Sequence, residues 1–273
     1  MYEDLREHFE TIGFTTAVPF TDDARSITTR WTRTSPRWRR RGRPVRPLRH
    51  TGEYYSLTDA ERKPVVEIHV EATADDATVV AGAAGNVPEI RDLAEAYEVV
   101  VADALRAMRP DHTYIHEQDL ADYYHRICDD IDLLIVIYKR GLTVPRSVLV
   151  DLSEREEVVA VKFAIEGATG YTTSIGNFLP EATLPLFDVL DAGDWDQARE
   201  FQRALRPLED LREEPGAGST MSAGNNAPVI NRGLKLAKLN GGPSREPLVG
   251  LSAEDEARLK EIYAHLGVTS FDA

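Results

Sequence analysis

One lysine stands where it could act as a nucleophile. Lys162 ends the apolar run 158–162 (VVAVK), and the ends of parallel strands open into the active site of an α/β barrel. Apolar neighbours lower the pKa of a lysine, so the neutral amine that attacks a carbonyl becomes accessible. The chain has 26 arginines but only six lysines, and an arginine cannot form an imine because its guanidinium stays protonated. We therefore predict that Lys162 forms a Schiff base, against the alternative of a strand-end lysine that reaches solvent.

Two further features could assist such a lysine. Tyr138 ends the preceding apolar run 133–138 (LLIVIY), and a phenol there can move a proton between the amine, a carbonyl oxygen and a leaving group. The alternative is a core aromatic residue at a strand end. Thr51, followed by Gly52 and Glu53, suits a tight turn that presents hydrogen-bond donors to a carboxylate.

A metal site is not expected. Two histidines four residues apart, His112 and His116, precede Glu117, but no further ligand follows at a recognisable spacing. The single cysteine, Cys128, excludes an internal disulfide and any zinc site built from several cysteines. We expect no metal and no cofactor.

The hydrophobic pattern places these residues on an α/β fold. Apolar runs without polar alternation, separated by helical segments, are typical of a parallel sheet covered on both faces. The predicted strands are 13–20, 78–81, 133–138, 158–163 and 171–175. The predicted helices are 2–11, 58–72, 88–101, 117–128, 145–152, 179–191, 195–213, 227–239 and 252–265.

The charge is distributed unevenly. The chain carries 46 acidic and 32 basic side chains, a net charge of −14, yet segment 24–50 holds ten arginines and no acid. The remainder therefore has 22 basic side chains and a net charge of −24. Arginines interleaved with Trp31 and Trp38 could bind nucleic acid, and the plainer alternative is a solvated basic stretch. A frame-shifted reading of GC-rich codons explains the composition better than either, because it gives Arg, Pro, Thr and Trp without acids, so we expect no nucleic-acid partner.

No segment predicts an association with a membrane. The longest apolar run, 133–138, is far too short to span a bilayer, and residues 1–12 lack the order of a signal peptide. We therefore expect a cytoplasmic protein.

Six motifs appear in the order of a known family. They are TGEYYSLTDAE, VVAGAAGNVPEI, LLIVIYKR, VVAVKF, GYTTSIGNFLPE and the closing NRGLKLAKLNGGPSREPLVGLSAEDEARLKEIYAHLGV. The chain resembles the dihydrodipicolinate synthase / N-acetylneuraminate lyase family of Schiff-base-forming (β/α)₈ lyases. The resemblance covers about residues 14–23 and 51–267.

The resemblance implies a lyase or aldolase acting on a 2-keto acid. Lys162 matches the family's imine-forming lysine, Tyr138 its proton shuttle, and Thr51 the hydroxyl that relays protons and holds the substrate carboxylate. Gly52, Arg140, Gly170 and Ser174 match positions near the substrate.

The residues that follow Tyr138 indicate which subgroup of the family the chain resembles. The Tyr138-x-Arg140 form and TGEYYSL look more like the sugar-acid members, which are 2-keto-3-deoxy sugar acid aldolases or dehydratases. The alternative is a pyruvate condensation of the 4-hydroxy-tetrahydrodipicolinate synthase type. Family members are commonly homo-oligomers, so the resemblance also implies self-association.

Two departures from the family predict an incomplete barrel. Segment 24–50 has the wrong composition for the second strand, and only seven residues separate Lys162 from Gly170, where a helix, a strand and a further helix belong. We expect a barrel over 1–213 with an abnormal second strand and no seventh strand, and a C-terminal helical extension over 214–273. A further alternative is therefore a degenerate member without catalysis.

Overall fold

The computed structural model describes residues 9–23, 48–73, 77–139, 144–162 and 168–266, with the side chains of 48–51 not included. The chain forms two units. Unit 1 comprises residues 1–13 and 44–172, and unit 2 comprises residues 14–43 and 173–273. The predicted limits 1–213 and 214–273 follow the family's architecture rather than these packing units, and they remain a prediction.

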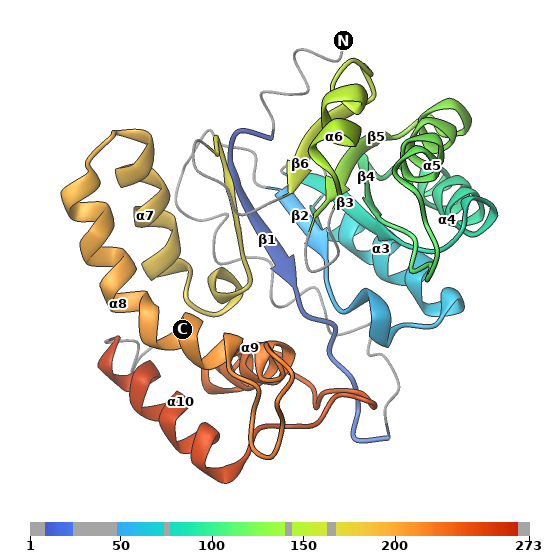
Figure 1. Ribbon diagram of the computed structural model, residues 1–273. Coiled ribbons are helices and arrows are strands. Elements are labelled where there is room, and N and C mark those ends of the chain that lie inside the picture. The colour runs from blue at the N-terminus through green and yellow to red at the C-terminus, as the bar shows by residue number, and fades with distance from the viewer. Residues whose placement is uncertain (1–8, 24–47, 74–76, 140–143, 163–167, 267–273) are drawn as a thin grey trace. The chain divides into compact units, whose positions relative to one another are not determined.

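Unit 1 is built on five parallel strands (Figure 1). They are β2 (Leu48–Thr51), β3 (Thr78–Ala83), β4 (Ala104–Met108), β5 (Leu134–Tyr138) and β6 (Val158–Lys162). Each strand pairs with the next in parallel, so all five carboxyl ends lie at one edge of the sheet. The register shifts once, between Ile135 and Val136, where the pairing of β5 with β6 skips one residue.

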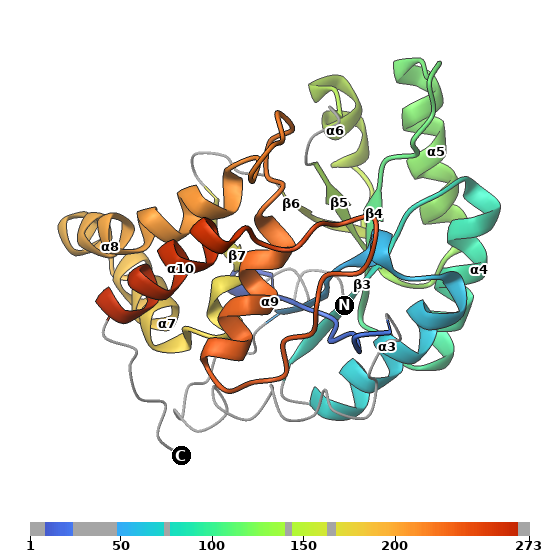
Figure 2. The same cartoon turned by 90° about the horizontal axis from the view of Figure 1, so that it is seen from below.

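Helices cover one face of this sheet, as Figures 1 and 2 show. They are α3 (Asp59–Thr73), α4 (Val87–Val99), α5 (Glu117–Asp130) and α6 (Arg146–Leu152). Alternate strand residues such as Ala81, Leu105 and Ile135 pack against these helices in one buried cluster. The intervening residues, among them Val80 and Val136, form a second cluster on the opposite face. Both faces are apolar, as the unalternating strand sequences predicted.

The strand order is that of an opened barrel. The seven strands of the described chain run β6-β5-β4-β3-β2-β1-β7, where β1 is Ile12–Thr16 and β7 is Tyr171–Thr173. The two strands at the ends of this order, β6 and β7, are consecutive in the sequence. The strand that would close an eight-stranded barrel is missing between them among the described residues, which is the incompleteness predicted from the short spacing between Lys162 and Gly170.

Unit 2 is mainly helical. Its elements are the short helix η4 (Ile175–Asn177) and the helices α7 (Pro180–Asp191), α8 (Trp195–Glu213), α9 (Asn226–Leu236) and α10 (Ala253–His265). Phe178 is fully buried at the centre, and its ring stacks on Tyr263 of α10 at a centroid distance of 6.4 Å. Gly233 of α9 lies directly against the Phe178 ring, because a Cβ there would come within 2.5 Å of it.

Two of the predicted elements need correction. Strand β4 was not predicted, because Arg106 interrupts its apolar sequence ALRAM. Residues 9–11 are turn and bend rather than the end of a helix, and the rest of the predicted helix 2–11 lies outside the described residues. Most of the arginine-rich segment also lies outside them, although its last residues enter β2 as a strand of four residues.

No helix in the described ranges is long and apolar enough to cross a membrane.

Candidate active site

Tyr138 and Lys162 lie side by side at the carboxyl edge of the sheet. They are the last residues of β5 and β6, and the pairing of these strands puts them opposite each other. The Lys162 Nζ lies 5.4 Å from the centroid of the Tyr138 ring. The Lys139 N–H donates to the Lys162 carbonyl at 3.1 Å, which extends the strand pairing past the two residues. The structure therefore brings together the two side chains that the sequence singled out.

Arg106 approaches the same ring and was not among the predicted site residues. Its Cζ lies 5.1 Å from the Tyr138 centroid, and the residue is only 5% exposed. Burial lowers the pKa of Arg106, while the phenols of Tyr138, Tyr55 and Tyr97, which are negative when ionised, act in the opposite direction. A charged residue inside an otherwise apolar strand was the available signal in the sequence.

Thr51 ends β2, and Gly52 and Glu53 follow it. Gly52 is buried, and Glu53 adopts a left-handed conformation with φ of 51° before the short helix η2 (Tyr54–Ser56) begins. A residue with a left-handed backbone thus links β2 to η2, and the tight turn stays a prediction. The Thr51 side chain lies outside the described residues, so its role in holding a carboxylate stays a prediction.

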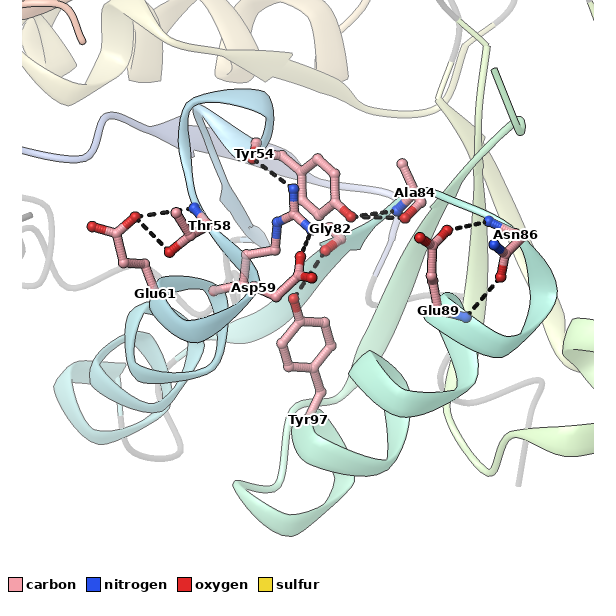
Figure 3. Close-up of polar contacts among 10 residues, drawn as sticks. Tyr54, Thr58, Asp59, Glu61, Gly82, Ala84, Asn86, Glu89 and Tyr97 are labelled. Carbon is pink, nitrogen blue, oxygen red and sulfur yellow. Dashed lines mark hydrogen bonds and ion pairs between the residues drawn. The ribbon is translucent and has the colours of Figure 1, made fainter. Parts of the chain in front are cut away.

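Tyr54 fastens this turn to the end of β3 (Figure 3). Its hydroxyl donates to the Ala84 carbonyl at 2.8 Å and accepts from the Ala84 N–H at 2.9 Å. The Arg62 guanidinium stacks on the Tyr54 ring at 3.8 Å and also pairs with Asp59. These contacts hold the turn after β2 against the neighbouring strand.

The structure describes two of the three further residues that were predicted to bind substrate. Gly170 packs against the backbone before β1, because a Cβ there would lie 2.5 Å from the Thr11 carbonyl oxygen. Ser174 belongs to unit 2, where its carbonyl accepts a hydrogen bond from the Asn177 side chain at 2.8 Å. Arg140 lies outside the described residues. Substrate binding by these three residues remains a prediction.

His112 and His116, which were not expected to bind a metal, accept hydrogen bonds from backbone N–H groups two residues further on. His116 caps α5, where its Nδ1 accepts from the Gln118 N–H at 3.1 Å. The His112 Nδ1 accepts from the Tyr114 N–H at 3.2 Å. No group of three or more potential ligand side chains that could hold a metal ion occurs within the described part of the chain.

A parallel sheet covered by helices, with a lysine beside a tyrosine at the carboxyl edge, has the architecture of an α/β-barrel lyase. Comparison with known proteins agrees. The model of the dihydrodipicolinate synthetase family matches residues 48–166, which include β2 to β6. Over this region, which is 119 of the 273 residues, the chain is similar to that family, and its relatives include proteins named as synthases and dehydratases.

Relatives and solved structures extend the match beyond that region. The chain is 26% identical over 256 residues to the 4-hydroxy-tetrahydrodipicolinate synthase of Methanothrix thermoacetophila, covering 80% of this chain and 83% of the relative. It is 25% identical over 253 residues to a probable 5-dehydro-4-deoxyglucarate dehydratase of Acidovorax ebreus, covering 78% and 80%. The crystal structure of dihydrodipicolinate synthase from Bacillus clausii superimposes with a TM-score of 0.88 at 25% identity, covering 97% of this chain and all of that one.

Proposed function

We propose that the protein is a Schiff-base-forming lyase that acts on a 2-keto acid, with Lys162 as the nucleophile and Tyr138 as the proton shuttle. The observation that carries the proposal is the placement of the Lys162 amine 5.4 Å from the Tyr138 ring centroid, at the edge of the sheet where barrel enzymes bind substrate.

The chemistry follows from an amine beside a phenol. The neutral Lys162 amine attacks the keto carbon and forms a C–N bond, the carbonyl oxygen leaves as water with the two amine hydrogens, and the imine nitrogen takes up a proton from the Tyr138 phenol or from solvent. The imine draws electrons from the neighbouring carbon, so a bond there can break or form. The Tyr138 phenol moves protons between nitrogen, oxygen and carbon during these steps.

For the substrate we propose a 2-keto-3-deoxy sugar acid, cleaved or dehydrated after imine formation. The sequence TGEYYSL and the Tyr138-x-Arg140 form support this choice, as does the similarity to two proteins named as probable 5-dehydro-4-deoxyglucarate dehydratases. A second candidate is the condensation of pyruvate with an aldehyde, favoured by the several relatives named 4-hydroxy-tetrahydrodipicolinate synthase.

Reductive trapping tests the shared first step. The protein is incubated with pyruvate and sodium borohydride, digested and analysed by mass spectrometry. We expect Lys162 to gain the mass of pyruvic acid less one oxygen, because reduction of the imine leaves a stable secondary amine. Lys162→Met should lose the adduct, whereas Lys139→Met, a change at the lysine that follows Tyr138 in the sequence, should keep it.

The outcome also separates activity from degeneration. A folded protein that gives no adduct at Lys162 with pyruvate or with a 2-keto-3-deoxy sugar acid would overturn the proposal and favour a member without catalysis. Where an adduct forms, the product identifies the reaction. Pyruvate release indicates aldol cleavage, loss of water from the sugar acid indicates dehydration, and consumption of pyruvate with an aldehyde indicates condensation.

A further inference from the structure

Arg106 lies on the same face of the sheet as Tyr138 and Lys162. Met108, Tyr138 and Lys162 lie opposite one another on β4, β5 and β6. Arg106 is two residues before Met108, and side chains two residues apart along a strand point to the same face. Arg106 is therefore one layer below the two residues of the proposed active site.

Small neighbours accommodate its long side chain. In the layer of Arg106, the strand pairing places Gly82 on β3 on one side and Val136 on β5 on the other, and Val136 in turn lies opposite Ala160 on β6. The guanidinium can thus extend along this face toward the Tyr138 ring, where its Cζ lies 5.1 Å from the centroid.

Two cationic side chains therefore share one aromatic ring. Arg106 Cζ and Lys162 Nζ lie 5.1 and 5.4 Å from the Tyr138 centroid, so they are at most 10.5 Å apart, the sum of those two distances. Both distances fall within the range in which a cation interacts with an aromatic face. A guanidinium keeps its proton, whereas the amine of a lysine can lose one, so any repulsion between them is relieved at Lys162.

We propose that Arg106 is a positioning residue of the imine-forming reaction, whose permanent charge keeps the Lys162 amine in its neutral form and fixes the Tyr138 ring between the two side chains. This inference rests on the function proposed above. The titratable groups that act on Arg106 include Tyr138 of β5, Tyr55 of η2 and Tyr97 of α4, and Lys162 of β6 lies against the same Tyr138 ring. Because Arg106 is 5% exposed and lies beneath the ring, direct binding of a substrate carboxylate is the less favoured role.

The test is the pH dependence of imine formation with pyruvate. The fraction of Lys162 trapped by borohydride is measured across pH for the wild type, Arg106→Met and Arg106→Lys. At 10.5 Å, the largest separation that the two distances allow, a like charge in a partly polar interior shifts a titration by about one pH unit, and a shorter separation shifts it further. We expect the midpoint of trapping to move upward by about that amount in Arg106→Met and to return toward the wild-type pH in Arg106→Lys.

If Arg106→Met does not fold, a measurement on the wild type still tests the proposal. Rates of reductive methylation across pH, mapped by mass spectrometry, report when each lysine becomes a free amine. Lys162 should react at lower pH than Lys63, an exposed lysine on α3. Equal profiles for the two lysines would overturn the role of Arg106.

The two proposals fail in different ways. If the wild type forms no adduct at Lys162, the proposed function is wrong. If the wild type forms the adduct but Arg106→Met leaves the midpoint unchanged, only the inference about Arg106 is wrong. An unchanged midpoint with a raised KM for pyruvate would instead assign Arg106 to substrate binding.

Discussion

Replacing Tyr54 by Phe removes one oxygen atom from the contact that fastens the turn after β2. The Tyr54 hydroxyl is both donor and acceptor for Ala84, at 2.8 and 2.9 Å, and the residue is only 6% exposed. Burial raises the pKa of Tyr54, so the hydroxyl is neutral and keeps the proton that it donates. The change leaves the ring, and with it the stacking of Arg62 at 3.8 Å, in place.

The expected loss follows from the two hydrogen bonds. Each contributes about 1 kcal/mol, and a polar group left without a partner in a buried position costs about 1–3 kcal/mol. Ala84 is half-buried, so water can reach part of the space. We therefore expect Tyr54→Phe to lower the free energy of unfolding of unit 1 by about 2 kcal/mol.

Tyr55 supplies the matched control. It is the next residue, its ring meets that of Tyr54 edge to face at 5.4 Å, and it is 76% exposed. Tyr55→Phe removes the same atom from a side chain that is mostly exposed, so the free energy of unfolding should change by less than about 0.5 kcal/mol.

Urea denaturation and hydrogen exchange measure the difference. In Tyr54→Phe the midpoint of the unit 1 transition should fall with an unchanged slope, and the Ala84 amide should exchange faster because its acceptor has gone. Equal stability of Tyr54→Phe and Tyr55→Phe, with unchanged exchange at Ala84, would refute the reasoning.

Three other changes test the packing. Asn86→Ala should lower the free energy of unfolding by about 1 kcal/mol in denaturant titrations, because the Asn86 side chain caps α4 by accepting from the Glu89 N–H, whereas Asn86→Ser should retain most of the cap. Gly233→Ala should lower the melting temperature by several degrees, since about 1–3 kcal/mol of crowding against Phe178 exceeds the gain in helix propensity. Burial raises the pKa of the Cys128 thiol to about 11, so a thiol reagent at pH 8 should label it only after unfolding. The unfolded thiol ionises near pH 9 and the folded one near pH 11, so the stability that the neutral thiol contributes is fully present below pH 9 and is lost as the pH rises to 11. Cys128→Ala should lack this part of the loss of stability at alkaline pH. An identical loss in Cys128→Ala would contradict the assignment.

The elements with uniform hydrophobic patterns were predictable from the sequence. The apolar runs 133–138 and 158–163 became β5 and β6 almost residue for residue, and the predicted helix 58–72 became α3, at whose start Glu61 accepts from the Thr58 N–H at 3.0 Å. In each case the pattern reflects burial on both faces of a strand or a local hydrogen bond, which needs no partner far away in the sequence.

The site was predictable in part for a related reason. Tyr138 and Lys162 could be paired from the sequence because each ends an apolar strand and parallel strands end at one edge. The approach of Arg106 to Tyr138 depends on the register of β4 with β5, which no local pattern reveals. The turn at Thr51 could be expected, but the clamp from Tyr54 to Ala84 joins residues 30 positions apart.

Of the two strands that were not predicted, β2 and β4, the second carries the buried charge. Placing a guanidinium in a sheet interior opposes folding, because desolvation disfavours the charged form, and it also breaks the apolar run by which a strand is recognised. Such local conflicts concentrate at functional sites, where a residue is retained for what it does rather than for the stability that it provides. Arg106 fits that description, because it lies against the ring that also contacts the proposed nucleophile, whereas Leu105 and Ala107 on the helix-facing side of β4 are fully apolar. The position of a mismatch between sequence pattern and structure is thus an independent argument that the chemistry of this protein extends one layer below the carboxyl edge of the sheet.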